Sequence, residues 1–232
     1  MDLLLFDIDG TLLKSKGAGR EALEEAFMAV HGWPDAMVGV SLAGATDGGI
    51  VRDVAARFGV TSDHVDVERV RAVYLAGLSA RLAEPGRAWP CPGVEQLLRR
   101  LRTRAHLAIL TGNWREGARR KLDAVGLGGG WGEGAYGDDA VNRDELVPFA
   151  VGRARAAGLE FDRVIVVGDT PADVSCARAG GALAVAVETG FATSQELADT
   201  RPDLLLPDLD RGGPWLEALV SRRGRKIGRA HV

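Results

Sequence analysis

The sequence has few of the residues that cross-link a protein or anchor it in a membrane. Its two cysteines, Cys91 and Cys176, lie far apart and match no metal-binding spacing, which predicts reduced thiols that are buried or half-buried. No apolar run approaches the about 20 residues that a membrane-spanning helix requires. Asp2, Asp7 and Asp9 interrupt the apolar stretch at the N-terminus, which argues against a signal peptide. We therefore expect a cytoplasmic protein without a membrane partner.

The sequence also lacks a strong excess of either charge. It has 29 Lys and Arg residues against 32 Asp and Glu residues, and the net charge of −3 gives no electrostatic reason to expect a nucleic-acid partner. His31, His64 and His106 are scattered without the spacing of a metal site, so we expect them to be structural or exposed. A chain of 232 residues is long enough for one large domain or for a core with a modest insert.

Short apolar runs alternate with helical patterns along the chain. The runs have the length and continuity of strands that are buried on both faces of a parallel sheet. They cover residues 3–6, 107–110, 164–167, 182–187 and, more weakly, 204–206. Helical spacing of apolar residues separates them, at 94–101, 145–157, 171–179 and 215–220. This alternation predicts an α/β fold with a doubly wound, Rossmann-like parallel sheet.

One region breaks the alternation, because it contains helical patterns and no convincing strand. The patterns cover residues 20–30, 49–58 and 65–82. The region ends at a cluster of chain-breaking residues, Glu84-Pro85-Gly86. We therefore predict an all-helical insert over 16–86, between two parts of the core at 1–15 and 87–226.

Two other stretches are not assigned to helices or strands. The glycine-rich residues 126–134 are predicted to form a loop, and no Gly-Lys-Ser/Thr follows them as a phosphate-binding loop would require. The last residues, 227–232, look like the translation of a cloning or assembly oligonucleotide. We treat them as an artefactual tail and exclude them from functional reasoning.

Two carboxylates stand at the end of the first predicted strand. Asp7 and Asp9 are two residues apart and are followed by Gly10 and Thr11. Alternate residues of a strand point to the same side, so both carboxylates can face one small volume, where they repel each other. A divalent cation offsets that repulsion and leaves one carboxylate free to attack. The segment therefore predicts a metal-assisted nucleophilic site.

Three more polar clusters lie where a predicted strand ends or a predicted helix begins. Thr111-Gly112-Asn113 follows the second strand of the core, and Asp169 and Asp173 follow the third. Arg143 opens a helix between these two clusters. Because ligands bind at the carboxyl ends of the strands in an open parallel sheet, we expect the four clusters to converge on one site.

The clusters, in this order, resemble the haloacid dehalogenase superfamily of phosphatases, and in particular its phosphoglycolate-phosphatase-like branch. The residues that carry the resemblance are Asp7-x-Asp9-Gly10-Thr11, Thr111, Arg143 and Gly168-Asp169-x-x-x-Asp173. The resemblance implies that the helical insert is a cap that closes over the site and selects the substrate. It also implies a phosphatase of small phosphorylated metabolites, with Mg²⁺ as cofactor.

The resemblance further implies a role for each catalytic residue. Asp7 is expected to be the nucleophile that forms an aspartyl-phosphate, and Asp9 the general acid and then the general base. Thr111 is expected to donate a hydrogen bond to a phosphoryl oxygen. Arg143 is expected to neutralise charge on the transferring group. Lysine is commoner than arginine at this position and the usual following proline is absent, so a neighbour of Arg143 is an alternative.

The expected metal ligands are Asp7, the backbone carbonyl of Asp9, and Asp169, because Mg²⁺ prefers oxygen ligands. Asp173 either binds the metal through a water molecule or orients Arg143, and the sequence leaves both roles open. The expected substrate-binding residues come from the core loops and from the cap. They are Gly10, Thr11, Gly112 and Asn113 in the core, and Thr46 and Arg52 in the cap.

Some other members of the superfamily fit the sequence poorly, whereas two other functions remain alternatives. A phosphonate-cleaving relative needs a cap lysine, but no lysine occurs between Lys16 and Lys121. A dehalogenase is not expected to carry Asp9. A sugar-phosphate mutase remains an alternative, as does a regulatory module that accepts a phosphoryl group on Asp7 without turnover. The protein is expected to be a monomer or a homodimer.

Overall fold

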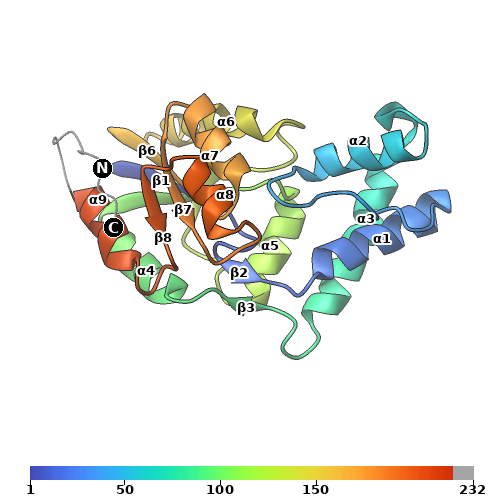
Figure 1. Ribbon diagram of the computed structural model, residues 1–232, viewed down its shortest axis with the longest axis horizontal. Coiled ribbons are helices and arrows are strands. Elements are labelled where there is room, and N and C mark those ends of the chain that lie inside the picture. Colours follow the sequence, from blue (N-terminus) through green and yellow to red (C-terminus); the bar gives the residue numbers. More distant parts are fainter. Residues whose placement is uncertain (222–232) are drawn as a thin grey trace.

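Residues 1–221 are described in a computed structural model of the chain. Within them, six strands form one sheet in the order β5-β4-β1-β6-β7-β8, and every neighbouring pair is parallel (Figure 1). The strands are β1 (Asp2–Phe6), β4 (Ala105–Leu110), β5 (Gly132–Ala135), β6 (Arg163–Gly168), β7 (Leu183–Val187) and β8 (Leu204–Leu206). Strand β1 lies between β4 and β6, and its residues are buried throughout.

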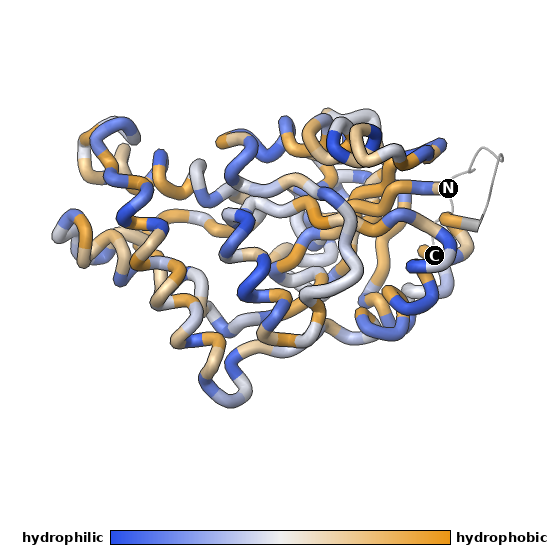
Figure 2. The backbone as a smooth tube through the Cα atoms, turned by 180° about the vertical axis from the view of Figure 1, so that it is seen from behind, coloured by the Kyte–Doolittle hydropathy of each residue, from blue (hydrophilic) through white to orange (hydrophobic). Residues whose placement is uncertain are grey.

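Helices cover both faces of the sheet. Successive side chains of a buried strand point to opposite faces, so each face presents apolar side chains for helices to cover. Leu4 and Phe6 belong to one hydrophobic cluster, and Leu3 and Leu5 to another. The first is covered by α4 (Val94–Leu101), α5 (Arg115–Ala124) and α9 (Gly213–Ser221). The second is covered by α6 (Leu146–Ala156), α7 (Pro171–Ala179) and α8 (Ser194–Asp199). Figure 2 shows the hydrophobic strands at the centre of this arrangement, which confirms the predicted doubly wound sheet.

A separate group of helices lies at one end of the molecule, between β1 and β4 in the chain (Figure 1). They are α1 (Ala18–His31), α2 (Asp47–Arg57), the 3₁₀ helix η1 (Ser62–His64) and α3 (Val67–Leu82). Their apolar side chains form their own hydrophobic cluster, which also includes Trp114 from the loop after β4. This confirms the helical cap as part of the fold.

The chain passes between the core and the cap through a short antiparallel ribbon. The ribbon pairs β2 (Leu13–Lys14) with β3 (Trp89–Pro90). Its strands lie just outside the predicted limits of the cap, 16 and 86, which remain a prediction. The two connections between core and cap are therefore hydrogen-bonded to each other, and any movement of the cap has to be accommodated beside them.

The prediction that residues 126–134 form a loop is wrong at its end. Gly132 and Gly134 belong to β5, which pairs with β4. A Cβ atom at Gly134 would lie 2.0 Å from the carbonyl oxygen of Ile109, so β5 can approach β4 this closely only because glycine stands there. The strand lacks the apolar side chains that mark the other strands in the sequence.

The predicted tail 227–232 and the preceding residues 222–226 lie outside the described residues. Among residues 1–221, none of the helices combines the length and the apolarity that crossing a membrane demands. Both cysteines are free and buried, as the sequence predicts.

Candidate active site

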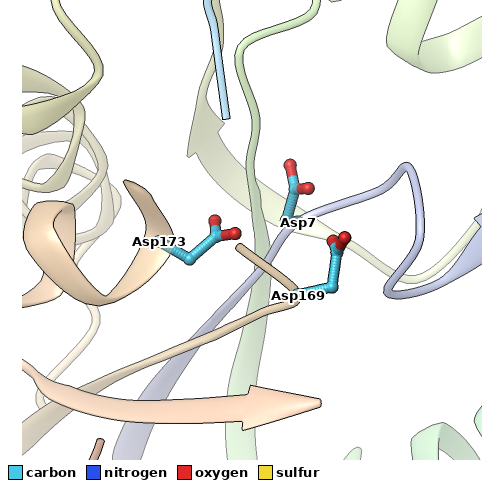
Figure 3. Close-up of side chains that lie close together, drawn as sticks. All are labelled: Asp7, Asp169 and Asp173. Carbon is cyan, nitrogen blue, oxygen red and sulfur yellow. The ribbon is translucent and has the colours of Figure 1, made fainter. Parts of the chain in front are cut away.

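Three buried carboxylates meet at the carboxyl end of the central strands. Asp7 follows β1, Asp169 follows β6, and Asp173 lies in the first turn of α7. One oxygen from each lies within 4.8 Å of the others. Figure 3 shows the three side chains gathered between the strand ends and the helix. Their proximity follows from topology, because β1 and β6 are parallel neighbours and end at the same edge of the sheet.

Burial makes ionisation of these carboxylates unfavourable. It raises the pKa of Asp7 to about 6, against the opposing effect of Arg143. Burial, together with the negative charges of Asp173 and Asp7, raises the pKa of Asp169 to about 8. Carboxylates that are crowded and hard to ionise without a counter-charge suit a divalent cation with oxygen ligands. The donor set therefore fits Mg²⁺.

Asp169 is held in place by neighbouring donors and by a glycine. Thr11 Oγ1 donates to its Oδ1 at 3.0 Å, and the backbone N–H of Phe191 donates to its Oδ2 at 3.0 Å. Gly10 has a positive φ of 87°, and a Cβ atom there would lie 2.4 Å from Asp169 Oδ2. The positive φ and the close approach to Asp169 both require glycine at this position. Thr11 thus contacts the carboxylate cluster, where the sequence had predicted a substrate contact.

Arg143 lies beside the carboxylates and is itself buried. Its Nη2 is 3.0 Å from Asp7 Oδ1 and 2.5 Å from Asp173 Oδ1. Although burial acts in the opposite direction, the charges of Asp173 and Asp7 raise the pKa of Arg143, so the guanidinium stays charged. Asp173 also accepts hydrogen bonds from the backbone N–H and hydroxyl of Thr170, at 3.0 and 2.7 Å. Of the two roles left open for Asp173, the contact with Arg143 is present here.

A second polar network surrounds Asp9. Asn113 Nδ2 donates to Asp9 Oδ2 at 2.8 Å and to Thr111 Oγ1 at 2.9 Å. Lys121, from α5, donates through its Nζ to Asp9 Oδ2 and to Asn113 Oδ1, both at 2.6 Å. The Lys121 side chain is only 5 % exposed. The sequence motifs do not identify this lysine as a site residue. The available signal was its helical spacing, four residues after Gly117 and next to Leu122, which are both buried.

These networks face a pocket of about 340 Å³ between the sheet and the cap. The predicted core residues Asp7, Asp9, Gly10, Thr111, Gly112, Asn113 and Arg143 line it. From the cap and the segment leading into it, the lining includes Lys14, Lys16, Arg20, Leu23, Gly44, Ala45, Asp47, Ile50 and Tyr74. The structure thus brings most of the residues predicted from the sequence to one cavity, with Asp169 and Asp173 beside Asp7.

The loop before α2 packs against the core loop after β4. The Asp47 N–H donates to the Gly112 carbonyl at 2.7 Å, and the Asp47 carboxylate accepts from the Trp114 N–H at 2.7 Å. A Cβ atom at Gly112 would lie 1.9 Å from the Ala45 carbonyl oxygen, so only glycine permits this approach. Burial raises the pKa of Asp47 to about 6, against the opposing effect of Lys121. The cap therefore packs closely against the core loop that carries Gly112 and Trp114.

Thr46 and Arg52, which the sequence predicts to contact the substrate, do not line this pocket. Thr46 is the N-cap of α2: its hydroxyl accepts from Gly49 N–H at 2.9 Å and donates to the Val141 carbonyl at 2.6 Å. Arg52 has a side chain that is 58 % exposed and pairs with Asp53 on the surface of the same helix. Both side chains are used locally, one for capping and one for an exposed ion pair.

Substitutions at these two positions should affect stability rather than catalysis. We expect Arg52→Ala to change kcat/KM by less than about 2-fold, because exposed ion pairs contribute little. Thr46→Ala should lower the free energy of unfolding by about 1 kcal/mol through loss of the helix cap. Steady-state kinetics and thermal unfolding of both variants measure these effects. A large loss of kcat/KM in a stably folded Arg52→Ala variant would return this residue to the substrate site.

Comparison with known proteins gives consistent matches over nearly the whole chain. The model of the haloacid dehalogenase-like hydrolase family matches residues 4–178. The phosphoglycolate phosphatase of Mesorhizobium japonicum is 24% identical over 90% of this chain and 91% of its own. A hydrolase from Pseudomonas syringae has a similar structure, with a TM-score of 0.73 and 21% identity over 95% of this chain and 100% of its own. CbbY from Rhodobacter sphaeroides, solved in complex with phosphate, has a TM-score of 0.71 and 19% identity over 91% and 96% of the two chains.

Proposed function

The chain belongs to the haloacid dehalogenase-like hydrolase family and is a phosphatase, a phosphoric monoester hydrolase, and on this premise we propose that it is Mg²⁺-dependent and works through an aspartyl-phosphate on Asp7. The observation that carries the proposal is the buried cluster of Asp7, Asp169 and Asp173, which lies next to Arg143 at the pocket. A carboxylate nucleophile, a cation site and a fixed guanidinium are together the parts that phosphoryl transfer needs.

The proposed metal ligands are Asp7, Asp169 and the backbone carbonyl of Asp9, with Asp173 close by. The raised pKa values of Asp7 and Asp169 support a cation there, because they mark negative charge that the protein alone does not compensate. When bound, Mg²⁺ would neutralise charge on the phosphoryl oxygens and keep Asp7 ionised. Arg143 supports anion binding as well: among residues 1–221, its buried Nε has no hydrogen-bond partner.

In the proposed reaction, a carboxylate oxygen of Asp7 attacks phosphorus and the bond to the leaving alcohol breaks. Asp9 gives its proton to that alcohol oxygen, and then takes a proton from the water that attacks phospho-Asp7. Inorganic phosphate leaves and both aspartates return to their starting states. Thr111 donates to a phosphoryl oxygen, and Arg143 balances its charge. The cap excludes bulk water while the phosphoryl group is transferred.

We propose a small phosphorylated metabolite as substrate, with phosphoglycolate as the first candidate. The named activity of the Mesorhizobium japonicum relative supports it, and the pocket of about 340 Å³ is large enough for such a molecule. The cationic side chains of Lys14, Lys16 and Arg20 on the pocket wall are consistent with an anionic substrate. A cytoplasmic location and a monomeric or homodimeric state are part of the same proposal.

The test is turnover of a panel of phosphate monoesters by the purified protein with and without Mg²⁺. We expect phosphate release from para-nitrophenyl phosphate and from phosphoglycolate, and loss of at least about 100-fold after removal of divalent cations by a chelator. Transfer of the phosphoryl group back to a sugar, with little phosphate released, would favour the mutase alternative. Turnover that is indifferent to divalent cations would contradict the proposed metal site.

A further inference from the structure

Lys121 contributes a second cation to the site, separate from Arg143. Its Nζ lies 2.6 Å from Asp9 Oδ2, whereas Arg143 Nη2 lies 3.0 Å from Asp7 Oδ1. The two carboxylates on the loop after β1 are therefore each paired with their own cation. These cations come from different elements, because Lys121 projects from α5 and Arg143 opens the 3₁₀ helix η2 (Arg143–Glu145).

The burial of Lys121 requires an explanation beyond packing. An ammonium group that is removed from water is strongly destabilising unless charged or polar partners surround it. The Lys121 side chain is 5 % exposed and itself borders the pocket, and its two hydrogen bonds are to Asp9 and Asn113, which line the pocket as well. Asp47 adds a further negative charge nearby. Arg120, next to Lys121 in the chain, shows the contrast, since it turns toward the cap and donates to the Leu75 carbonyl and to Ser79.

Lys121 also sets the orientation of the Asn113 amide. An ammonium group only donates hydrogen bonds, so the Asn113 atom at 2.6 Å from Nζ has to be the carbonyl oxygen. The Asn113 NH₂ group then faces Asp9 Oδ2 and Thr111 Oγ1, at 2.8 and 2.9 Å. Without Lys121, the amide could turn over and present its oxygen to Asp9, which would repel the carboxylate. The lysine therefore organises both neighbours.

These contacts hold one oxygen of the Asp9 carboxylate in place, so the other oxygen is the one available for proton exchange. Asp9 Oδ2 accepts from both Asn113 and Lys121, and within residues 1–221 no hydrogen bond reaches Oδ1. The Asp9 side chain is 25 % exposed, and the residue lines the pocket. Proton exchange with a ligand or a water molecule is thus left to Oδ1. Fixing Oδ2 determines where Oδ1 can lie.

We propose that Lys121 is the positioning residue for proton transfer by Asp9: with Asn113, it holds Asp9 Oδ2 so that Oδ1 is presented to the leaving oxygen. This inference rests on the proposed function, because it needs Asp9 to act as general acid. Lys121 touches neither the phosphoryl group nor the nucleophile in this scheme. The contribution of Lys121 to the rate should therefore be larger for leaving groups that need more protonation.

The leaving group provides a readout that a purely structural role would not affect. Para-nitrophenolate leaves as a stable anion and needs little protonation, whereas an alkoxide, as from phosphoglycolate, needs a proton as the bond breaks. We expect Lys121→Met to lower kcat/KM for phosphoglycolate by about 100-fold and for para-nitrophenyl phosphate by less than about 5-fold, since general acid catalysis contributes on that scale. The measured parameter is kcat/KM, because it reports the steps up to alcohol release and excludes hydrolysis of phospho-Asp7.

Two other variants complete the experiment. Lys121→Arg keeps a charged donor and should recover part of the activity with phosphoglycolate. Arg120→Met, on the same helix, removes contacts with the cap but not with Asp9, so any loss should be equal for the two esters. Should Lys121→Met fail to fold by circular dichroism and thermal unfolding, Lys121→Gln provides the same comparison with a neutral polar side chain.

An equal loss for both esters in the Lys121 variant, or no loss, would overturn the positioning role even if the wild-type enzyme behaves as proposed. Absence of Mg²⁺-dependent turnover in the wild-type protein would instead overturn the proposed function, and this inference with it. The two failures are therefore distinguishable, because the first appears only in a variant and the second appears before any variant is made.

Discussion

Replacing Asp7 with asparagine should abolish phosphatase turnover and leave the fold intact. Asparagine has nearly the same shape, but its amide is a far weaker nucleophile and a poorer metal ligand, so kcat should fall by at least about 10⁴-fold. Burial and the charges of Asp173 and Asp9 oppose ionisation of Asp7, so the neutral amide should be tolerated or even stabilising in the metal-free protein. Steady-state phosphate release and thermal unfolding measure the two effects.

Asp2→Asn is the matched control for this experiment. Asp2 lies on the same strand and is also buried, but it is at the opposite end of β1 and pairs with Arg163 at 2.6 Å. Its substitution should lower stability, because Arg163 loses its carboxylate partner, and should leave kcat within about 2-fold. Residual turnover above about one per cent in Asp7→Asn, at a wild-type Km and melting temperature, would mean that another group attacks phosphorus.

The carboxylate site could be predicted because its residues follow strands that are easy to identify. Asp7 and Asp169 come directly after apolar runs, and the rule that parallel strands end at one edge brings them together. The family match over residues 4–178 confirms the resemblance that these clusters suggested. Arg143 was predicted with an alternative left open, and its short contacts with Asp7 and Asp173 could not be foreseen, because they depend on the path of the segment before α6.

The surroundings of Thr46, Arg52 and Lys121 depend on tertiary contacts, which the sequence does not show. Thr46 and Arg52 are predicted to contact the substrate because they lie in the cap, but the direction of a side chain around α2 is not visible in a motif. The sequence does not single out Lys121, because a lysine among arginines on an amphipathic helix is normally exposed. Its burial arises only when α5 packs beside the loop that carries Asp9 and Asn113. In each case burial, and not residue type, determined the role.

Mg²⁺ should stabilise the protein strongly at about pH 8 and weakly at about pH 5. The native pKa values of Asp7 and Asp169, about 6 and about 8, lie above the ordinary value of 3.8. The metal-free native state therefore holds more protons than the unfolded chain in this interval. Its stability is highest below the unfolded pKa and declines as pH rises through the native values. Mg²⁺ requires the deprotonated carboxylates, so its binding should strengthen over the same range.

The expected size of the effect is set by the affinity. At a Mg²⁺ concentration of about 100 times Kd, binding adds about 2.7 kcal/mol, which for a domain of this size raises Tm by about 5–10 °C. Thermal unfolding with Mg²⁺ or chelator, across the pH series, measures the difference. Asp169→Asn separates this site from other titrating groups, because it removes the residue with the larger rise in pKa and a proposed ligand. The variant should lose most of the stabilisation by Mg²⁺ and much of the decline of stability with pH. An equal stabilisation by Mg²⁺ at both pH values in the wild-type protein would contradict exchange of protons for the cation.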